Sequence, residues 1–111
     1  MKRDDDLIRG LLFEAEASED PLFGPFDEED ERRYEHARLL CDAGLFQQVQ
    51  SGVFRMTNHG HDYLDAIRSE GVWKKTRAAA STMGGVGLGI MKDIATAYVR
   101  QELSARLEMP L

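Results

Sequence analysis

The sequence predicts a mainly α-helical protein of the α+β class, with one small β-hairpin and a long C-terminal helix. Three observations support this prediction. Through most of the chain, apolar residues recur every three or four positions, the spacing that places them on one face of a helix. Between residues 45 and 57 this spacing is replaced by two short β-prone runs on either side of Ser51-Gly52. After a glycine-rich stretch, helical spacing returns and continues to Glu108.

The first helix is predicted in DDDLIRGLLFEAEASE, residues 4–19. Its leading aspartates suit a helix N-terminus, where the helix dipole favours negative charge. The following stretch, DPLFGPF, contains two prolines and a glycine and is predicted to be a loop. Three apolar side chains of this loop are expected to pack back against the core: Leu22, Phe23 and Phe26.

The second helix is predicted from Asp27 to Ala43, within DEEDERRYEHARLLCDAGLF. Acids crowd its first turns, and Gly44 stands where a helix C-cap commonly lies. Its expected buried stripe consists of Tyr34, Ala37, Leu40 and Cys41. The hairpin follows, with strands predicted at Leu45–Gln50 and Val53–Thr57 and a tight turn at Ser51-Gly52.

A third helix is predicted in HDYLDAIRSEGVWKKTRAAAS, residues 61–81, and Gly71 is the expected site of any interruption or kink. The glycine-rich TMGGVGLGI then leads to the last helix. That helix carries an i+4 ladder and three further apolar residues beside it: Met91, Ala95, Val99, Leu103 and Leu107, with Ile90, Ile94 and Tyr98. We expect one domain overall. Residues 1–83 form its winged-helix-like core, and residues 84–111 add a glycine-rich turn and a helix that packs on the core or on a dimer partner.

The formal net charge of −6 is unevenly distributed along the chain. Residues 1–70 contain 17 acids and 8 bases, which gives −9, whereas residues 71–111 contain 3 acids and 6 bases, which gives +3. This distribution excludes a uniformly basic nucleic-acid-binding protein, but it is compatible with a local basic face.

The cysteine content and the N-terminus bear on where the protein is located. The single cysteine, Cys41, cannot form an internal disulfide, which favours a reducing compartment. The first ten residues contain acids where a signal peptide would have its apolar core, and no apolar run approaches the length of a membrane span. We therefore expect a cytoplasmic protein that does not enter the membrane.

The stretch TNHGHDYLD raises the question of a metal site, because His59 and His61 lie close together in the sequence. Residues two apart on a helix point about 200° away from each other, so these two imidazoles could share an ion only on a strand. Thr57 is a natural N-cap residue after the preceding strand, which favours a helix start. We therefore predict no metal ligands here. A buried imidazole bonded to a backbone carbonyl would account for His61.

The other candidate catalytic motifs are incomplete. Gly84, Gly85, Gly87 and Gly89 follow a helical segment and lack the spacing of a dinucleotide-binding or phosphate-binding loop. Cys41 lies on the apolar stripe of its helix, which is typical of an inert core thiol. No nucleophile has a base at a suitable spacing. We therefore expect no catalytic residues, no metal and no cofactor, in a protein that is not an enzyme.

The predicted order of helix, helix, hairpin, helix and helix resembles a winged helix. HARLLCDAGLF carries most of this resemblance, because a helix there ends in Ala-Gly-Leu and runs into the first wing strand. The chain also resembles, nearly from end to end, a family of small bacterial and phage proteins known as domain of unknown function 2513. The matching pieces are MKRDDDLIRGLL, HARLLCDAGL, RMTNHGHDYLDAIR, VWKK, and GG followed by IMKDIA. This resemblance implies a winged-helix-like fold and almost no chemistry. The chain departs from the family in its short wing loop, Ser51-Gly52, which disfavours contact of the wing with a DNA groove.

In a winged helix, the second helix of this chain would take the position of the recognition helix. Its candidates for contact with phosphates or guanine edges are Arg32, Arg33, His36 and Arg38. Further contacts with the DNA backbone are expected from Arg55, Lys74, Lys75 and Arg77. The acids DEEDE at the start of this helix oppose the interpretation, because they repel phosphate and could pair with the same arginines, for example Glu28 with Arg32.

The last helix is longer than a small core needs, which indicates either a dimer interface or packing across the chain's own helices. The expected interface consists of Met91, Ile94, Ala95, Tyr98, Val99 and Leu103. The leading functional hypothesis is a dimeric DNA-binding transcriptional regulator of bacterial or phage origin, with double-stranded DNA as its partner. The alternative is an acidic protein–protein interaction module, such as an inhibitor or adaptor from a mobile element. A metal-dependent hydrolase built on His59 and His61 is a third and weaker hypothesis.

Overall fold

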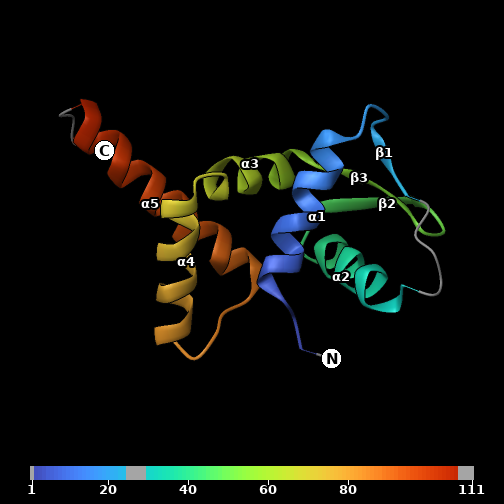
Figure 1. The fold of residues 1–111 in the computed structure, drawn as a ribbon, viewed down its shortest axis with the longest axis horizontal. Helices are drawn as coiled ribbons and strands as arrows, with labels where there is room; N and C mark the ends of the chain where they lie inside the picture. Colours follow the sequence, from blue (N-terminus) through green and yellow to red (C-terminus); the bar gives the residue numbers. More distant parts are fainter. Residues whose placement is uncertain (1, 25–29, 108–111) are drawn as a thin grey trace. The chain divides into compact units, whose positions relative to one another are not determined.

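The computed structural model describes residues 2–24 and 30–107, and these ranges contain five helices and three strands (Figure 1). In chain order the elements are α1 (Asp5–Ala17), β1 (Leu22–Phe23), α2 (Glu31–Asp42), β2 (Phe46–Gln50), β3 (Val53–Met56), α3 (Asn58–Ile67), α4 (Glu70–Thr82) and α5 (Leu88–Leu107). The predicted class, mainly helical α+β with a long C-terminal helix, is confirmed. The elements form two compact units, Met1–Leu64 and Asp65–Leu111, and the division falls inside α3.

Helix α1 begins at Asp5 because the residue before it caps the helix. The side chain of Asp4 accepts hydrogen bonds from the backbone N–H groups of Asp6 and Leu7, at 3.0 and 3.1 Å. These bonds satisfy two of the N–H groups that have no partner within the helix. The buried face of the helix consists of Ile8, Leu11 and Leu12.

Helix α2 ends where the sequence predicts. Gly44 adopts a φ of 78°, and the N–H of Leu45 donates to the carbonyl of Leu40 at 2.9 Å, which is the pattern of a Schellman motif. The helix therefore ends at the predicted place, with Ala43 as the C-cap and Gly44 as the residue of positive φ that follows it. In the structure α2 begins at Glu31, whereas its predicted first residue, Asp27, lies outside the described residues.

The sheet has three strands, not only the two of the predicted hairpin. Strand β1 pairs antiparallel with β3, with Leu22 opposite Arg55 and Phe23 opposite Phe54, and the strand order is β1-β3-β2. The prediction that this stretch is a loop is therefore wrong at Leu22 and Phe23, and Phe26 lies outside the described residues. The cause is a long-range pairing of two residues, which leaves no local periodicity in the sequence. The hairpin and its tight turn are confirmed, with Gly52 at a φ of 73°.

Aromatic side chains from the sheet fill the core of the first unit. The rings of Phe46 and Phe54 lie 6.1 Å apart, and Tyr34 of α2 meets Phe54 edge-on at 6.3 Å. From α2, Ala37 and Leu40 are fully buried, as predicted, whereas Tyr34 is half-buried. Helix α2 therefore covers the sheet with the face that the sequence assigns to it.

Helix α3 starts at Asn58, directly after the predicted N-cap Thr57 and three residues before the predicted range 61–81. The hydroxyl of Thr57 accepts a hydrogen bond from the N–H of Gly60 at 3.1 Å and donates to the carbonyl of Gly44 at 2.6 Å. A side chain at Gly60 would collide with the carbonyl of Leu45 and with Met56. Thr57 thus caps α3 and ties it to the end of α2, and Gly60 allows the close approach of the helix to this segment.

The second unit contains the end of α3 together with α4 and α5. A single helix was predicted over residues 61–81, but the chain leaves the helix at Arg68 and restarts at Glu70. Ser69 is extended and its side chain accepts from the N–H of Val72 at 3.1 Å, so the break is an N-cap. Gly71, the predicted site of any interruption, lies in the first turn of α4 instead.

Helices α4 and α5 pack against each other after a turn at residues 83–87, where Gly84 and Gly85 adopt positive φ angles of 77° and 98°. The buried residues of α4 are Val72, Trp73, Thr76 and Ala80. Those of α5 are Leu88, Met91 and Ala95. Within the described parts of the chain, no helix combines the length and the apolar character needed to cross a bilayer.

Candidate functional site

The arginines of α2 are held by acidic side chains. Arg32 forms an ion pair with Asp4, the capping residue of α1. Arg33 makes two hydrogen bonds to the carboxylate of Glu14, at 2.7 and 3.3 Å, and its Nε lies 3.1 Å from Asp30. Both arginines thus join α2 to α1 and are already neutralised by carboxylates. The predicted pairing of Arg32 with Glu28 lies outside the described residues.

Two pKa shifts follow from these ion pairs. The hydrogen bond from Arg32 is the main reason that the pKa of Asp4 lies below its ordinary value, and the capped N–H groups of α1 add to the effect. The carboxylate of Glu14 raises the pKa of Arg33, with a further contribution from Asp30. In both cases the ion pair stabilises the charged form of the group.

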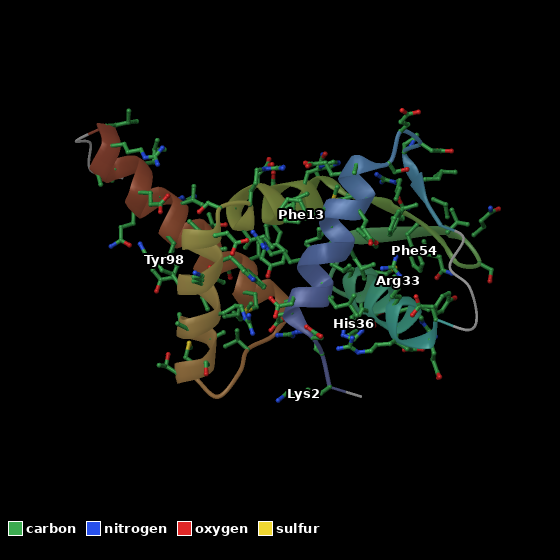
Figure 2. All side chains as sticks on the ribbon, in the orientation of Figure 1. Lys2, Phe13, Arg33, His36, Phe54 and Tyr98 are labelled. Carbon is green, nitrogen blue, oxygen red and sulfur yellow. The ribbon has the colours of Figure 1, made fainter. Side chains whose placement is uncertain are left out.

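His36, labelled on α2 in Figure 2, is fully buried, and both of its ring nitrogens form hydrogen bonds. The backbone N–H of Asp4 donates to Nε2 at 2.9 Å, so Nε2 carries no proton. Nδ1 lies 2.8 Å from the carbonyl oxygen of Arg32 and must therefore carry the proton and donate. The expectation that His36 contacts DNA is not supported, because its ring has no exposed surface. The buried imidazole that the sequence suggested for His61 is found here, since His61 itself is exposed.

The two histidines of TNHGHDYLD lie in the first turns of α3, and both are exposed. On a helix their directions differ by about 200°, so the geometric part of the prediction is confirmed. Within residues 2–24 and 30–107, no three side chains of histidine, cysteine, aspartate or glutamate converge to hold a metal. Cys41 is a free, half-buried thiol.

The remaining predicted DNA contacts lie on exposed surfaces of separate elements. Arg38 has a loose pair with Glu35 at 3.9 Å, and Arg55 of β3 donates from Nε to the side chain of Gln47 at 2.6 Å. On α4, Lys74, Lys75 and Arg77 are all exposed. The Nζ of Lys75 lies 5.9 Å from the ring centre of Tyr98, and Arg77 approaches the ring of Trp73 at 5.8 Å.

The lysines of α4 differ in one respect from the arginines of α2. Neither Lys74 nor Lys75 forms an ion pair with any carboxylate that the structure describes. The sequence of residues 65–111 contains seven bases and five acids, a net charge of +2, whereas residues 1–64 contain seven bases and fifteen acids, a net charge of −8. Lysines without an ion pair to a described carboxylate are therefore found on α4, whereas the predicted recognition helix offers the loosely paired Arg38.

The predicted dimer interface on α5 is divided between the protein's core and its surface. Met91 and Ala95 are fully buried within the chain, and Ile94 and Tyr98 are half-buried. The other two members, Val99 and Leu103, are 36% and 44% exposed.

The reason for this division is geometric. Each step of four residues turns about 40° around a helix, so a long i+4 ladder cannot stay on one face. Leu107, the next step of the ladder, is 53% exposed, although the sequence-based interface did not include it. We call Val99, Leu103 and Leu107 the α5 row. Figure 1 shows that this end of α5 runs past α4, the helix against which α5 packs.

Comparison with known proteins identifies the family. An uncharacterized protein of Haemophilus influenzae is 28% identical over 120 aligned residues, which cover 94% of this chain and all of that protein. No solved structure matches the chain. The model of the family described as "Hypothetical protein (DUF2513)" matches residues 2–87, a range that includes α1 to α4 and ends just before α5. Because that match covers well over half of the sequence, the chain belongs to the DUF2513 family.

Proposed function

We propose that this protein works by binding another protein, as a non-enzymatic interaction module. The observation that carries the proposal is the distribution of exposed apolar side chains. Among the described residues, the exposed large hydrophobic ones are Leu22, Val49, Met83, Ile90, Val99, Leu103 and Leu107. Five of these seven lie between residues 83 and 107, and three of the five form the α5 row.

The second unit is too small to cover its own apolar surface. A helix with an apolar face is stable in water when that face is buried against another element, and here the buried residues of α5, Leu88, Met91 and Ala95, all lie in its first half. Removing apolar surface from water stabilises a complex by about 25 cal/mol per Å² of buried surface. A row of three large side chains left in solvent therefore favours association, and such patches commonly mark protein interaction sites.

The geometry of α2 disfavours DNA binding by a recognition helix. Arg32 and Arg33 would have to leave carboxylates of α1 to contact phosphates, and His36 is inaccessible. A helix-turn-helix also joins its two helices by a turn of three or four residues. Here residues 18–30, which include strand β1, separate α1 from α2. The net charge of −8 on residues 1–64 adds long-range repulsion.

Site-specific photo-crosslinking in the host cell tests the proposal. A photo-reactive amino acid in place of Leu103 should give a discrete protein adduct on irradiation, because that side chain lies at the centre of the α5 row. The matched control is Ile90, which is 47% exposed on the same helix but lies outside the row. Position 90 should give little or no adduct. Equal yields at both positions, or no adduct at position 103, would contradict the proposal.

A second candidate function, a DNA-binding regulator of transcription, is favoured by Lys74 and Lys75 of α4, which form no ion pair with a described carboxylate. If this function is correct, the protein should bind a random DNA duplex at low salt, and its affinity should fall steeply between about 50 and 200 mM salt. Charge reversal of Lys74 and Lys75 should then reduce binding by tenfold or more, on the order of 0.7 kcal/mol or more for each lost phosphate contact. Arg38→Glu on α2 is the matched control and should have little effect. Fluorescence anisotropy decides the question, and the protein-binding proposal expects no binding even at low salt.

A further inference from the structure

We propose that the α5 row binds the same row of a second copy of this chain, with the two helices antiparallel. This inference rests on the proposed function and names its partner. A two-fold axis passing beside Ser104 relates the two helices in this arrangement. Two features of α5 support it: the spacing of the row, and the charges on one of its flanks.

The row has the spacing that an antiparallel pair requires. Its members are four residues apart, so a two-fold axis at position 104 places Leu107 of the second copy level with position 101, midway between Val99 and Leu103. Leu103 of the second copy falls level with position 105, midway between Leu103 and Leu107. Along this stretch the two rows alternate at intervals of about 3 Å, and Leu103 and Leu107 of each copy enter the two gaps of the other row.

Charge on one flank of the row fits the same axis. Glu102 and Arg106 lie on the same side of the row, four residues apart, yet neither pairs with any described residue. The axis at position 104 brings Glu102 level with Arg106 of the second copy, and the same pair forms again by symmetry. Arg100 lies on the opposite flank, where its two copies are about 12 Å apart along the axis. This distance exceeds the screening length of about 8 Å at physiological salt, so the two like charges repel each other only weakly.

The size of the row sets the expected strength of the dimer. Residues 99–107 span about 12 Å of helix, and a stable interface typically buries about 800 Å² on each partner. This contact is smaller, so the dimer should be weak, with a dissociation constant on the order of 100 μM. The fraction of dimer should therefore rise as the protein concentration passes through this value.

Sedimentation equilibrium of the full chain at increasing concentration measures this association. Leu103→Asp should weaken the dimer at least about tenfold, because each copy would place a carboxylate in the apolar row. Ile90→Asp provides the matched control, because it puts the same charge on an exposed apolar position of the same helix outside the row. It should leave the dissociation constant unchanged. Circular dichroism would verify that both variants keep the wild-type helix content.

A charge swap tests the antiparallel arrangement itself. Glu102→Arg and Arg106→Glu should each weaken the dimer about tenfold, because each places like charges opposite one another twice. The double variant E102R/R106E restores both pairs and should recover wild-type affinity. A double variant as weak as the single ones would overturn the proposal, as would a wild-type chain that stays monomeric at millimolar concentration. If the chain is monomeric while position 103 crosslinks to a different protein, self-pairing fails and the protein-binding function stands. If neither is observed, both fail.

Discussion

At the scale of single residues, the buried polar groups of the first unit have contrasting environments. His36 has a partner for each ring nitrogen, and it thereby fixes the backbone of Asp4 against α2. The hydroxyl of Tyr63 is buried as deeply, but it has no hydrogen-bond partner among the described residues. Burial, and to a lesser degree the charge of Asp5, raises the pKa of this hydroxyl. The ring of Tyr63 therefore stabilises the core, whereas its hydroxyl does not.

This contrast predicts the effect of Tyr63→Phe. Removing an unpaired buried hydroxyl removes its desolvation cost and keeps the ring, so the free energy of unfolding should stay constant or rise by up to about 1 kcal/mol. Urea denaturation followed by circular dichroism measures the change. Tyr63→Ala is the comparison, and loss of the buried ring should lower the free energy of unfolding by about 3 kcal/mol or more. A clear loss of stability in Tyr63→Phe would mean that the hydroxyl has a partner in solution.

At the scale of elements, local signals in the sequence predicted what local chemistry decides. Thr57 was identified as an N-cap, Gly44 as a C-cap and Ser51-Gly52 as a tight turn, because each depends on residues within about five positions. The break before α4 was misplaced for an instructive reason. Gly71 is the expected helix breaker from the sequence. In the structure, however, the side chain of Ser69 accepts a hydrogen bond from the N–H of Val72 and caps a new helix.

Features that depend on distant partners could not be predicted in this way. Strand β1 exists because Leu22 and Phe23 pair with β3, more than thirty residues later. The partners of Arg32 and Arg33 lie on α1 and at Asp30, whereas the sequence offered nearer acids at the start of α2. The predicted DNA-contact surface consequently lost its central residues. Its members on α4, Lys74, Lys75 and Arg77, are exposed in the structure.

The same distinction explains the outcome on α5. The i+4 ladder predicted from Met91 onward is real, but a ladder of that length turns steadily from the core into solvent. Its first members are therefore already buried and its last members are available. Sequence spacing alone identifies an apolar ladder. The rotation of about 40° per step then indicates which of its residues are buried in the protein and which remain exposed for binding.

At the scale of the whole molecule, charge is unequally divided, and the acidic part depends on ion pairs between its helices. The carboxylate of Asp4 both caps α1 and holds Arg32 of α2, so one titratable group joins two helices. Its pKa is lower in the folded protein than in the unfolded chain. The stabilisation is therefore fully present above the unfolded value of about 3.9 and is lost as the pH falls through the lower folded value.

Asp4→Asn tests this linkage, because asparagine caps a helix about as well as aspartate but cannot form the ion pair. Near neutral pH the variant should be less stable than wild type by less than about 1 kcal/mol, since both side chains are partly solvated. The difference should begin to shrink as the pH falls below about 4, where this carboxylate is protonated in the unfolded chain, and should disappear below its lower folded pKa. Urea denaturation across this range measures it, and Glu16→Gln on the exposed side of α1 is a control for general charge effects. A difference that stays constant at low pH would show that the ion pair with Arg32 does not hold α1 to α2.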